Sequence, residues 1–227
     1  MVDVMLDPKF VQLVHQIDPD SKLLRSWALT GGISAQVMAL EVQSANGDVQ
    51  KWVLRQHSAR QIADNPQSAA HEFAIMGALQ AAGVPVPAPI YLDESHSLFE
   101  RPYLVMGYIE GETQFAPDDL NHYIGQFTRQ MVKIHAVDMA QQDLAFLPDQ
   151  AAWYTHKLQN RPAVLDDSLQ EGRIRDALEA AWPFPNMNQP VLMHGDYWPG
   201  NILWQGDQLA AVIDFEDTAL GDPLNDL

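Results

Sequence analysis

Two short segments near the C-terminus carry residue types and a spacing that suit phosphoryl transfer. Residues 194–201 read HGDYWPGN and residues 213–216 read IDFE, and each segment follows an apolar, strand-like run. Phosphoryl transfer needs one carboxylate to orient and deprotonate an attacking hydroxyl. It also needs an amide oxygen and a second carboxylate to hold Mg²⁺ against nucleotide phosphates. Asp196, Asn201 and Asp214 offer these groups in loops at strand ends.

The two motifs, in this order and spacing, resemble the catalytic and metal-binding loops of the aminoglycoside phosphotransferase family, protein-kinase-like enzymes that phosphorylate small molecules. The resemblance implies that Asp196 is the catalytic base. It also implies that Asn201 and Asp214 bind Mg²⁺, which prefers oxygen ligands and takes few of them from protein. His194 is expected to hold the loop by hydrogen bonding and not to take part in the chemistry.

Two more segments resemble the parts of this family that hold ATP phosphates. Residues 30–34 read TGGIS and occupy the place of the glycine-rich loop, where backbone N–H groups approach phosphate oxygens closely. The resemblance assigns Gly31, Gly32 and Ser34 to this contact. Arg55 and Glu72 resemble the ion pair between a third-strand cation and a helix carboxylate. Protein kinases use Lys at the first position, and arginine can grip phosphate through two nitrogens.

The base of the nucleotide is expected between two apolar segments. Residues 103–111 resemble the hinge between the two lobes, and the resemblance implies that backbone groups of Gly107 and Ile109 bond the adenine edge. Leu203 and Ile213 would then pack on the base. The implied cofactors are ATP and Mg²⁺, and the implied acceptor is a hydroxyl group of a small molecule.

Local patterns predict the elements that must position these loops. Helical spacing occurs in a first segment that extends to about Ser26, from Ser68 to Ala82, and over less regular residues 151–182. The clearest helix follows Pro117, with an apolar stripe of Leu120, Ile124, Phe127, Met131 and Ile134. Strands are expected near residues 27–29, 37–43, 49–55, 88–92 and 103–109. Asn46-Gly47 predicts a type I′ hairpin turn between two of them.

A strand-rich first half therefore precedes a mainly helical second half. This order predicts an α+β protein with the bilobal, protein-kinase-like fold: an antiparallel-sheet nucleotide-binding lobe over residues 1–106 and a helical lobe with both loops over residues 107–227. Residues 221–227 resemble the family segment after the metal loop, which further helices follow in relatives. The resemblance thus implies a C-terminally short chain, and apolar surface left uncovered would favour self-association.

The composition of the chain excludes several classes of binding partner. The 227 residues carry a formal charge of −17 and no cysteine, which excludes disulfides and thiolate metal sites. Such a surface repels nucleic acid and anionic membranes. The first seven residues have acids where a signal peptide has bases, and no apolar run reaches the roughly 20 residues of a membrane span. We expect a cytoplasmic protein that binds neither nucleic acid nor membrane.

Three alternatives stay open from the sequence. The loop at residues 194–198 is also similar to those of fructosamine kinases, and choline kinases share the same frame. A second alternative is a nucleotide-binding protein with impaired catalysis, since Arg55 departs from the usual lysine. The third is a metal-dependent hydrolase that uses His194, Asp196 and Asp214, although no second well-spaced histidine ligand is present.

Overall fold

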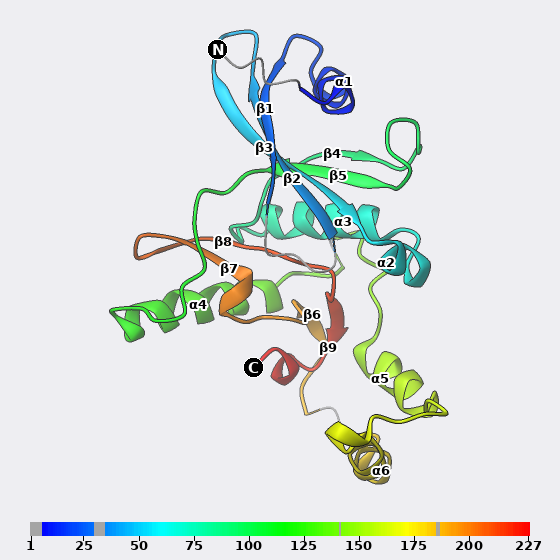
Figure 1. The fold of residues 1–227 in the computed structure, drawn as a ribbon. Coiled ribbons are helices and arrows are strands. Elements are labelled where there is room, and N and C mark those ends of the chain that lie inside the picture. Colours follow the sequence, from blue (N-terminus) through cyan, green and yellow to red (C-terminus); the bar gives the residue numbers. More distant parts are fainter. Residues whose placement is uncertain (1–5, 30–34, 141, 185–186) are drawn as a thin grey trace.

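The computed structural model describes residues 6–29, 35–140, 142–184 and 187–227. Its first half is an antiparallel sheet with helices beside it (Figure 1), in the strand order β1-β2-β3-β5-β4. The strands are β1 (Lys22–Ala28), β2 (Ala35–Gln43), β3 (Val49–His57), β4 (Pro89–Asp93) and β5 (Tyr103–Gly107); the helices are α1 (Pro8–Ile17), α2 (Ala59–Asp64) and α3 (Ser68–Ala81).

The second half is mainly helical and carries short strands around the two polar loops. Its helices are α4 (Leu120–His135), α5 (Gln150–Gln159) and α6 (Glu171–Ala181), with short 3₁₀ turns η1 (Asp167–Leu169), η2 (Pro199–Asn201) and η3 (Pro223–Asp226). Its strands are β6 (Val191–Met193), β7 (Ile202–Gln205), β8 (Gln208–Val212) and β9 (Ala219–Gly221), paired as β6-β9 and β7-β8. This order of elements agrees with the predicted α+β class.

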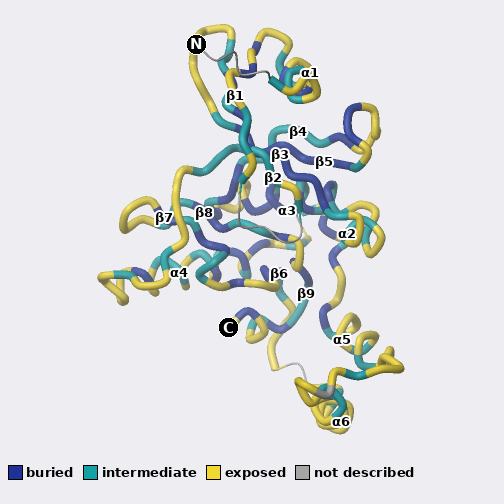
Figure 2. The backbone as a smooth tube through the Cα atoms, viewed as in Figure 1, coloured by how far each residue is buried: buried dark blue, intermediate teal, exposed yellow. Residues whose placement is uncertain are grey.

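Two apolar clusters hold these elements together. One lies between α1 and the sheet, and includes Leu13, Leu40 and Tyr103. The other joins α3 of the first half to α4 and the short strands of the second half. A backbone bond of 2.8 Å from Val212 to Pro85 adds a polar link between the halves. The loops of the second half are therefore fixed against the sheet by continuous packing, which Figure 2 shows as buried backbone in the middle of the molecule.

Several local predictions need correction. The first helix ends at Ile17, and β1 begins at Lys22, well before the predicted strand start at 27. Residues 151–182 form two helices separated by a loop. In α4, Met131 and Ile134 are buried as predicted, but Leu120 and Ile124 are 58% and 50% exposed. The core-facing side of α4 at its N-terminal end is occupied by Tyr123, whose ring stacks on Trp204 with ring centres 4.3 Å apart, so Leu120 and Ile124 lie outside the buried face.

The hairpin between β2 and β3 is present with a different turn. Of its two key residues only Gly47 has a positive φ, +90°. The N–H of Gly47 bonds the Ser44 carbonyl at 2.9 Å, and the loop closes with a bond from Ser44 to Asp48. Asn46 instead accepts the Asp48 N–H on its side chain at 3.0 Å. This local bond gives the loop an alternative to the type I′ geometry.

Candidate functional site

His194 fixes the loop that carries Asp196. Its side chain is fully buried, with Nε2 3.0 Å from the Ile213 carbonyl oxygen and Nδ1 3.3 Å from the Asp196 backbone nitrogen. The carbonyl needs a donor and the N–H needs an acceptor, so the ring is neutral with its proton on Nε2. Burial agrees with this assignment, because it lowers the pKa of His194. Both nitrogens are occupied, as expected for a structural histidine.

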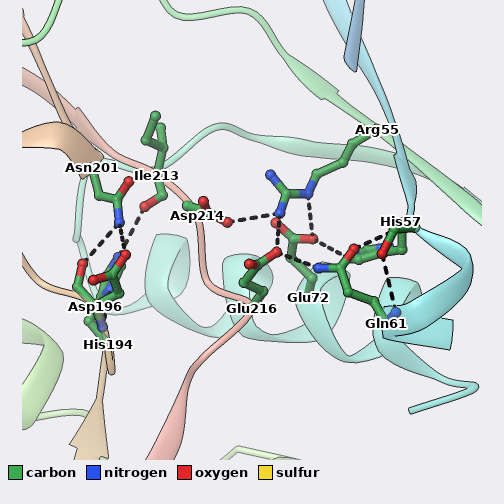
Figure 3. A network of polar contacts seen from close by, with 11 residues as sticks. Arg55, His57, Gln61, Glu72, His194, Asp196, Asn201, Ile213, Asp214 and Glu216 are labelled. Atoms are coloured by element: carbon green, nitrogen blue, oxygen red, sulfur yellow. Dashed lines mark hydrogen bonds and ion pairs between the residues drawn. The ribbon is translucent and has the colours of Figure 1, made fainter. Parts of the chain in front are cut away.

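Asn201 orients the Asp196 carboxylate. The Asn201 amide donates from Nδ2 to the Asp196 backbone oxygen at 2.9 Å and to Asp196 Oδ2 at 2.8 Å. Asn201 is buried on η2, whereas Asp196 is exposed. The carboxylate is therefore held by its neighbour and still reachable by a small molecule. Figure 3 shows the amide oxygen of Asn201 pointing away from Asp196.

The loop with Asp214 lies beside this group. The Ile213 N–H donates to the Asn201 carbonyl at 2.9 Å, which brings the two predicted metal ligands to adjacent backbone positions. Asp214 has a φ of +68°, a left-handed conformation that is uncommon outside glycine and concentrates at functional sites. Asn201 and Asp214 offer an amide and a carboxylate oxygen. These hard oxygen donors fit Mg²⁺, which fills its remaining positions with phosphate and water oxygens.

A buried ion-pair cluster lies on the sheet side of the site. Arg55 Nε and His57 Nε2 lie 3.1 and 2.8 Å from the same oxygen of Glu72, and all three side chains are buried. Burial alone would raise the pKa of Glu72, but the charge of Arg55 and the His57 hydrogen bond outweigh it, and the net pKa is lowered. The predicted pairing of Arg55 with Glu72 is thus present. His57 adds a partner that the sequence did not indicate.

Arg55 also reaches the metal loop. Its Nη2 donates to Asp214 Oδ1 at 2.8 Å and to Glu216 Oε2 at 2.9 Å. Gln61 donates to the same Glu216 oxygen from α2. Burial lowers the pKa of Arg55, but Glu72, Asp214 and Glu216 together raise it, so the guanidinium stays charged. Figure 3 shows the resulting chain of contacts from β3 to the loop after β8.

Asp226 anchors the catalytic loop from the far end of the chain. It accepts the backbone N–H groups of His194 and Gly195 at 2.9 and 2.8 Å, and the ring of His135 lies 2.9 Å away. Burial would raise the pKa of Asp226, but these hydrogen bonds lower it overall. The sequence indicates no role for Asp226, because nothing near it in the chain connects it to a loop that begins about 30 residues earlier. Gln61 did leave a signal, the S-x-x-Q capping pattern that starts α2.

In the hinge segment, some backbone groups form hydrogen bonds within the protein and others remain available to a ligand. The Gly107 N–H bonds the Ala88 carbonyl at 2.8 Å, so Gly107 can offer only its carbonyl to a ligand. No backbone carbonyl in the described ranges accepts the Ile109 N–H. Beyond the hinge, Glu112 and Trp204 exchange two backbone bonds of 3.0 and 2.9 Å. This pairing brings β7, and with it the partly buried Leu203, next to the hinge.

Three of the predicted phosphate contacts cannot be assigned a position, and a large cavity lies away from the two polar loops. Gly31, Gly32 and Ser34 lie outside the described residues. A cavity of about 590 Å³ with a mainly apolar wall lies between α5, α6 and the C-terminal segment. No described group of three or more His, Asp or Glu side chains forms a metal cage. No described helix is long and apolar enough to cross a membrane.

Comparison with known proteins places this geometry in a family. Residues 28–227 match the Phosphotransferase enzyme family, APH. The chain belongs to this family. The match covers most of the chain and both polar loops, so the family predicted from the HGDYWPGN and IDFE motifs is confirmed.

Curated relatives of this family member are much longer than the matched region. Acyl-CoA dehydrogenase family member 10 of Mus musculus is 27% identical over 191 residues, which cover 77% of this chain and 18% of that protein. Acyl-CoA dehydrogenase family member 11 of Homo sapiens is 23% identical over 194 residues, covering 78% and 24%. The chain therefore spans less than a quarter of the length of these relatives, and their names describe proteins of which it matches a minor part.

Solved structures share the fold of this family member. A putative aminoglycoside phosphotransferase from Ralstonia eutropha has a TM-score of 0.71 at 19% identity, covering 96% of this chain and 67% of that one. The GDP and kanamycin complex of APH(2")-IIia gives 0.68 at 20%, covering 96% and 75%. APH(4)-Ia with AMP-PNP and hygromycin B gives 0.68 at 18%, covering 97% and 75%. The protein-kinase-like α+β fold is confirmed.

Proposed function

We propose that this protein is an ATP- and Mg²⁺-dependent phosphotransferase that moves the γ-phosphoryl group to a hydroxyl of a small molecule. The observation that carries the proposal is the pairing of Asn201 with Asp196 beside the Asp214 loop. The carboxylate of Asp196 is exposed and oriented, and two candidate metal ligands, the side-chain oxygens of Asn201 and Asp214, come from neighbouring loops. Solved relatives with AMP-PNP or GDP and an aminoglycoside give independent support for a nucleotide and a small acceptor.

In this proposal Asp196 accepts the proton of the acceptor hydroxyl. The acceptor oxygen forms a bond to the γ-phosphorus, the bond to the bridging oxygen breaks, and the nucleoside diphosphate leaves. Asn201 and Asp214 would hold Mg²⁺, which offsets phosphate charge when it is bound. Arg55, kept in place by Glu72, would contact the phosphates. Catalysis in this class rests on positioning and electrostatic stabilisation.

The base-binding part of the proposal uses the hinge. The Gly107 carbonyl and the Ile109 N–H would bond the adenine edge, and Leu203 and Ile213 would pack on its faces. Gly31, Gly32 and Ser34 stay predicted phosphate contacts. The division at residues 106 and 107 stays a prediction as well, since it follows from the same hinge assignment.

The hydrolase alternative loses support from His194, because both ring nitrogens bond within the protein and neither is available to a metal. The fructosamine-type and choline-type alternatives would use the same proposed nucleotide site of this chain. They differ only in the acceptor, which a substrate screen with ATP must decide.

Two variants test the proposal with separate readouts. Asp196→Asn should leave binding of a non-hydrolysable ATP analogue nearly unchanged and cut turnover by about 10² or more, because an amide cannot accept the proton. Asp214→Ala should weaken Mg²⁺-dependent analogue binding as well. Calorimetry and steady-state kinetics on both variants separate the roles, and equal modest losses in both would show that the assignment is wrong.

A further inference from the structure

Gln61 of α2 uses both ends of its side-chain amide, one within its own helix and one toward the metal loop. Its Oε1 accepts the Ser58 N–H at 2.8 Å, and Ser58 Oγ accepts the Gln61 N–H at 3.2 Å. These two reciprocal bonds form a capping box that fixes the first turn of α2. The remaining amide group, Nε2, donates to Glu216 Oε2 (Figure 3). The cap therefore holds the Gln61 side chain so that its N–H groups face the loop that carries Asp214.

This contact joins the two halves of the molecule at the metal loop. Gln61 follows β3 of the sheet half, whereas Glu216 follows β8 of the second half, 155 residues further along the chain. Glu216 lies shortly after Asp214, the candidate metal ligand with a φ of +68°. A left-handed backbone at a non-glycine residue costs energy and persists only where the surrounding structure holds it. Contacts that fix Glu216 therefore help to keep the Asp214 carboxylate in place.

Arg55 donates to the same Glu216 oxygen, but this guanidinium is shared among several groups. Its Nη2 lies 2.9 Å from Glu216 and 2.8 Å from Asp214, and its Nε lies 3.1 Å from Glu72. In the proposed function Arg55 also contacts the nucleotide phosphates, which would compete with the loop carboxylates for its N–H groups. Gln61 carries no charge, so phosphates would not draw it away from Glu216 in the same way. The bond from Gln61 can thus persist when the nucleotide binds.

We propose that Gln61 is a positioning residue for the metal loop: through Glu216 it holds Asp214 where Mg²⁺ binds, and it does so independently of Arg55. The proposal rests on the proposed phosphotransferase function, and it gives α2 a part that none of the nucleotide contacts assigned above includes. Gln61 acts through Glu216 and needs no contact with the metal or the substrate. Its loss should lower the affinity of the site for Mg²⁺-bound nucleotide and leave the binding of metal-free nucleotide nearly unchanged.

Two variants of the capping box separate the loop contact from the stability of α2. Gln61→Met removes one cap bond and the bond to Glu216, whereas Ser58→Ala removes the other cap bond and keeps the Glu216 contact. Calorimetry on the full 227-residue chain measures the affinity for a non-hydrolysable ATP analogue with and without Mg²⁺. We expect the Mg²⁺-dependent gain in affinity to fall about fivefold in Gln61→Met, because a bond to a partly exposed charged group is lost, and to be unchanged in Ser58→Ala. Equal changes in both variants would show that Gln61 only caps its helix, and would overturn the proposal.

A double-mutant cycle tests the pairing of the two side chains directly. Gln61→Glu keeps a side-chain oxygen that can cap α2, but it places a second carboxylate beside Glu216, and the repulsion should reduce the Mg²⁺-dependent gain. In the Glu216→Gln background the same substitution again sets an amide opposite a carboxylate. We therefore expect Gln61→Glu to lower the gain in wild type and not in this background. Equal losses in the two backgrounds overturn the proposal.

Hydrogen exchange without any ligand distinguishes this positioning role from the proposed function. Amide exchange of the ligand-free protein reports the opening of residues 213–218, where the Ile213 N–H is bonded to the Asn201 carbonyl. We expect these amides to exchange about fivefold faster in Gln61→Met than in wild type, and at the wild-type rate in Ser58→Ala. Unchanged exchange in Gln61→Met overturns the proposal. A wild-type protein that binds no ATP analogue, with the exchange result as expected, would instead contradict the phosphotransferase function and support the role of Gln61 in holding the loop.

Discussion

Arg55 Nη2 lies 2.8 Å from Asp214 Oδ1, so the candidate phosphate-binding cation is paired with the candidate metal ligand. The same guanidinium holds Glu72 through Nε and Glu216 through Nη2. Three carboxylates thus share one buried cation. In the proposed phosphotransferase, Asp214 would hold Mg²⁺ and Arg55 would contact the phosphates, so binding of the nucleotide would offset this concentration of negative charge.

Arg55→Met should destabilise the protein and remove nucleotide binding. Glu72 would keep only its contact with His57 among these partners, and breaking a buried ion pair in this way typically costs about 3–5 kcal/mol. Arg55→Lys keeps the charge but offers one compact ammonium, which cannot reach Glu72 and both loop carboxylates together. We expect the free energy of unfolding in urea and the affinity for an ATP analogue of the Lys variant to lie between those of the Met variant and wild type. A Met variant as stable as wild type would show that the cluster is not a structural ion pair.

Asp226→Asn should loosen the catalytic loop and change the acid stability. The amide has one acceptor in place of two ionised oxygens, and the loss of charged hydrogen bonds costs about 1.5–3 kcal/mol. The pKa of Asp226 is lower in the folded protein than in the unfolded chain, so its stabilisation is present above the ordinary value of 3.8 and is lost as pH falls further.

The variant should therefore unfold more easily than wild type near pH 7 and approach it at pH 3 and below. Urea unfolding as a function of pH measures the difference, and Asp207→Asn serves as the exposed control. A destabilisation of equal size at pH 7 and pH 3 would mean that the charge of Asp226 does not support the loop.

Gly195→Ala should abolish turnover and lower solubility or stability. A Cβ at this position would lie 2.1 Å from the Asp217 carbonyl oxygen, and the φ of +85° disfavours any side chain. Gly206→Ala is the matched control. It also has a positive φ, +62°, but nothing lies within 4 Å of the added carbon, so we expect only the backbone cost of about 1 kcal/mol. Thermal unfolding and ATP turnover of the two variants give the comparison, and an active, stable Gly195→Ala protein would exclude close packing of the two loops.

The sequence predicted the parts of the site that depend on local pattern. Strand-like runs before the HGDYWPGN and IDFE motifs place Asp196 and Asp214 in loops, and the family resemblance correctly pairs Arg55 with Glu72. The fold class follows from the same alternation of strands and helices. These predictions agree with the structure because each depends on a few neighbouring residues or on a motif that includes them.

Long-range contacts were not predictable in this way. Asp226 reaches His194 because η3 folds back under the catalytic loop, and no local pattern encodes that return. His57 and Gln61 acquire their roles only when β3 and α2 lie beside α3 and the metal loop. The predicted stripe of α4 was wrong at Leu120 and Ile124, because the buried face there carries the aromatic Tyr123, which a count of aliphatic residues at helical spacing passes over.

The bonds on either side of the hinge set where the two halves can rotate. The Tyr108 N–H is bonded to the Lys51 carbonyl, and Glu112 is paired with Trp204, so only Ile109–Gly111 lies between the two anchors. Glu110 also pairs with Lys51 of β3, and an added carbon on Gly111 would lie 2.9 Å from the Trp204 oxygen. Any rotation of one half against the other at this segment must then change the φ and ψ angles of these residues. If the protein is the phosphotransferase proposed above, the torsional stiffness of this three-residue linker would then influence the rate of product release.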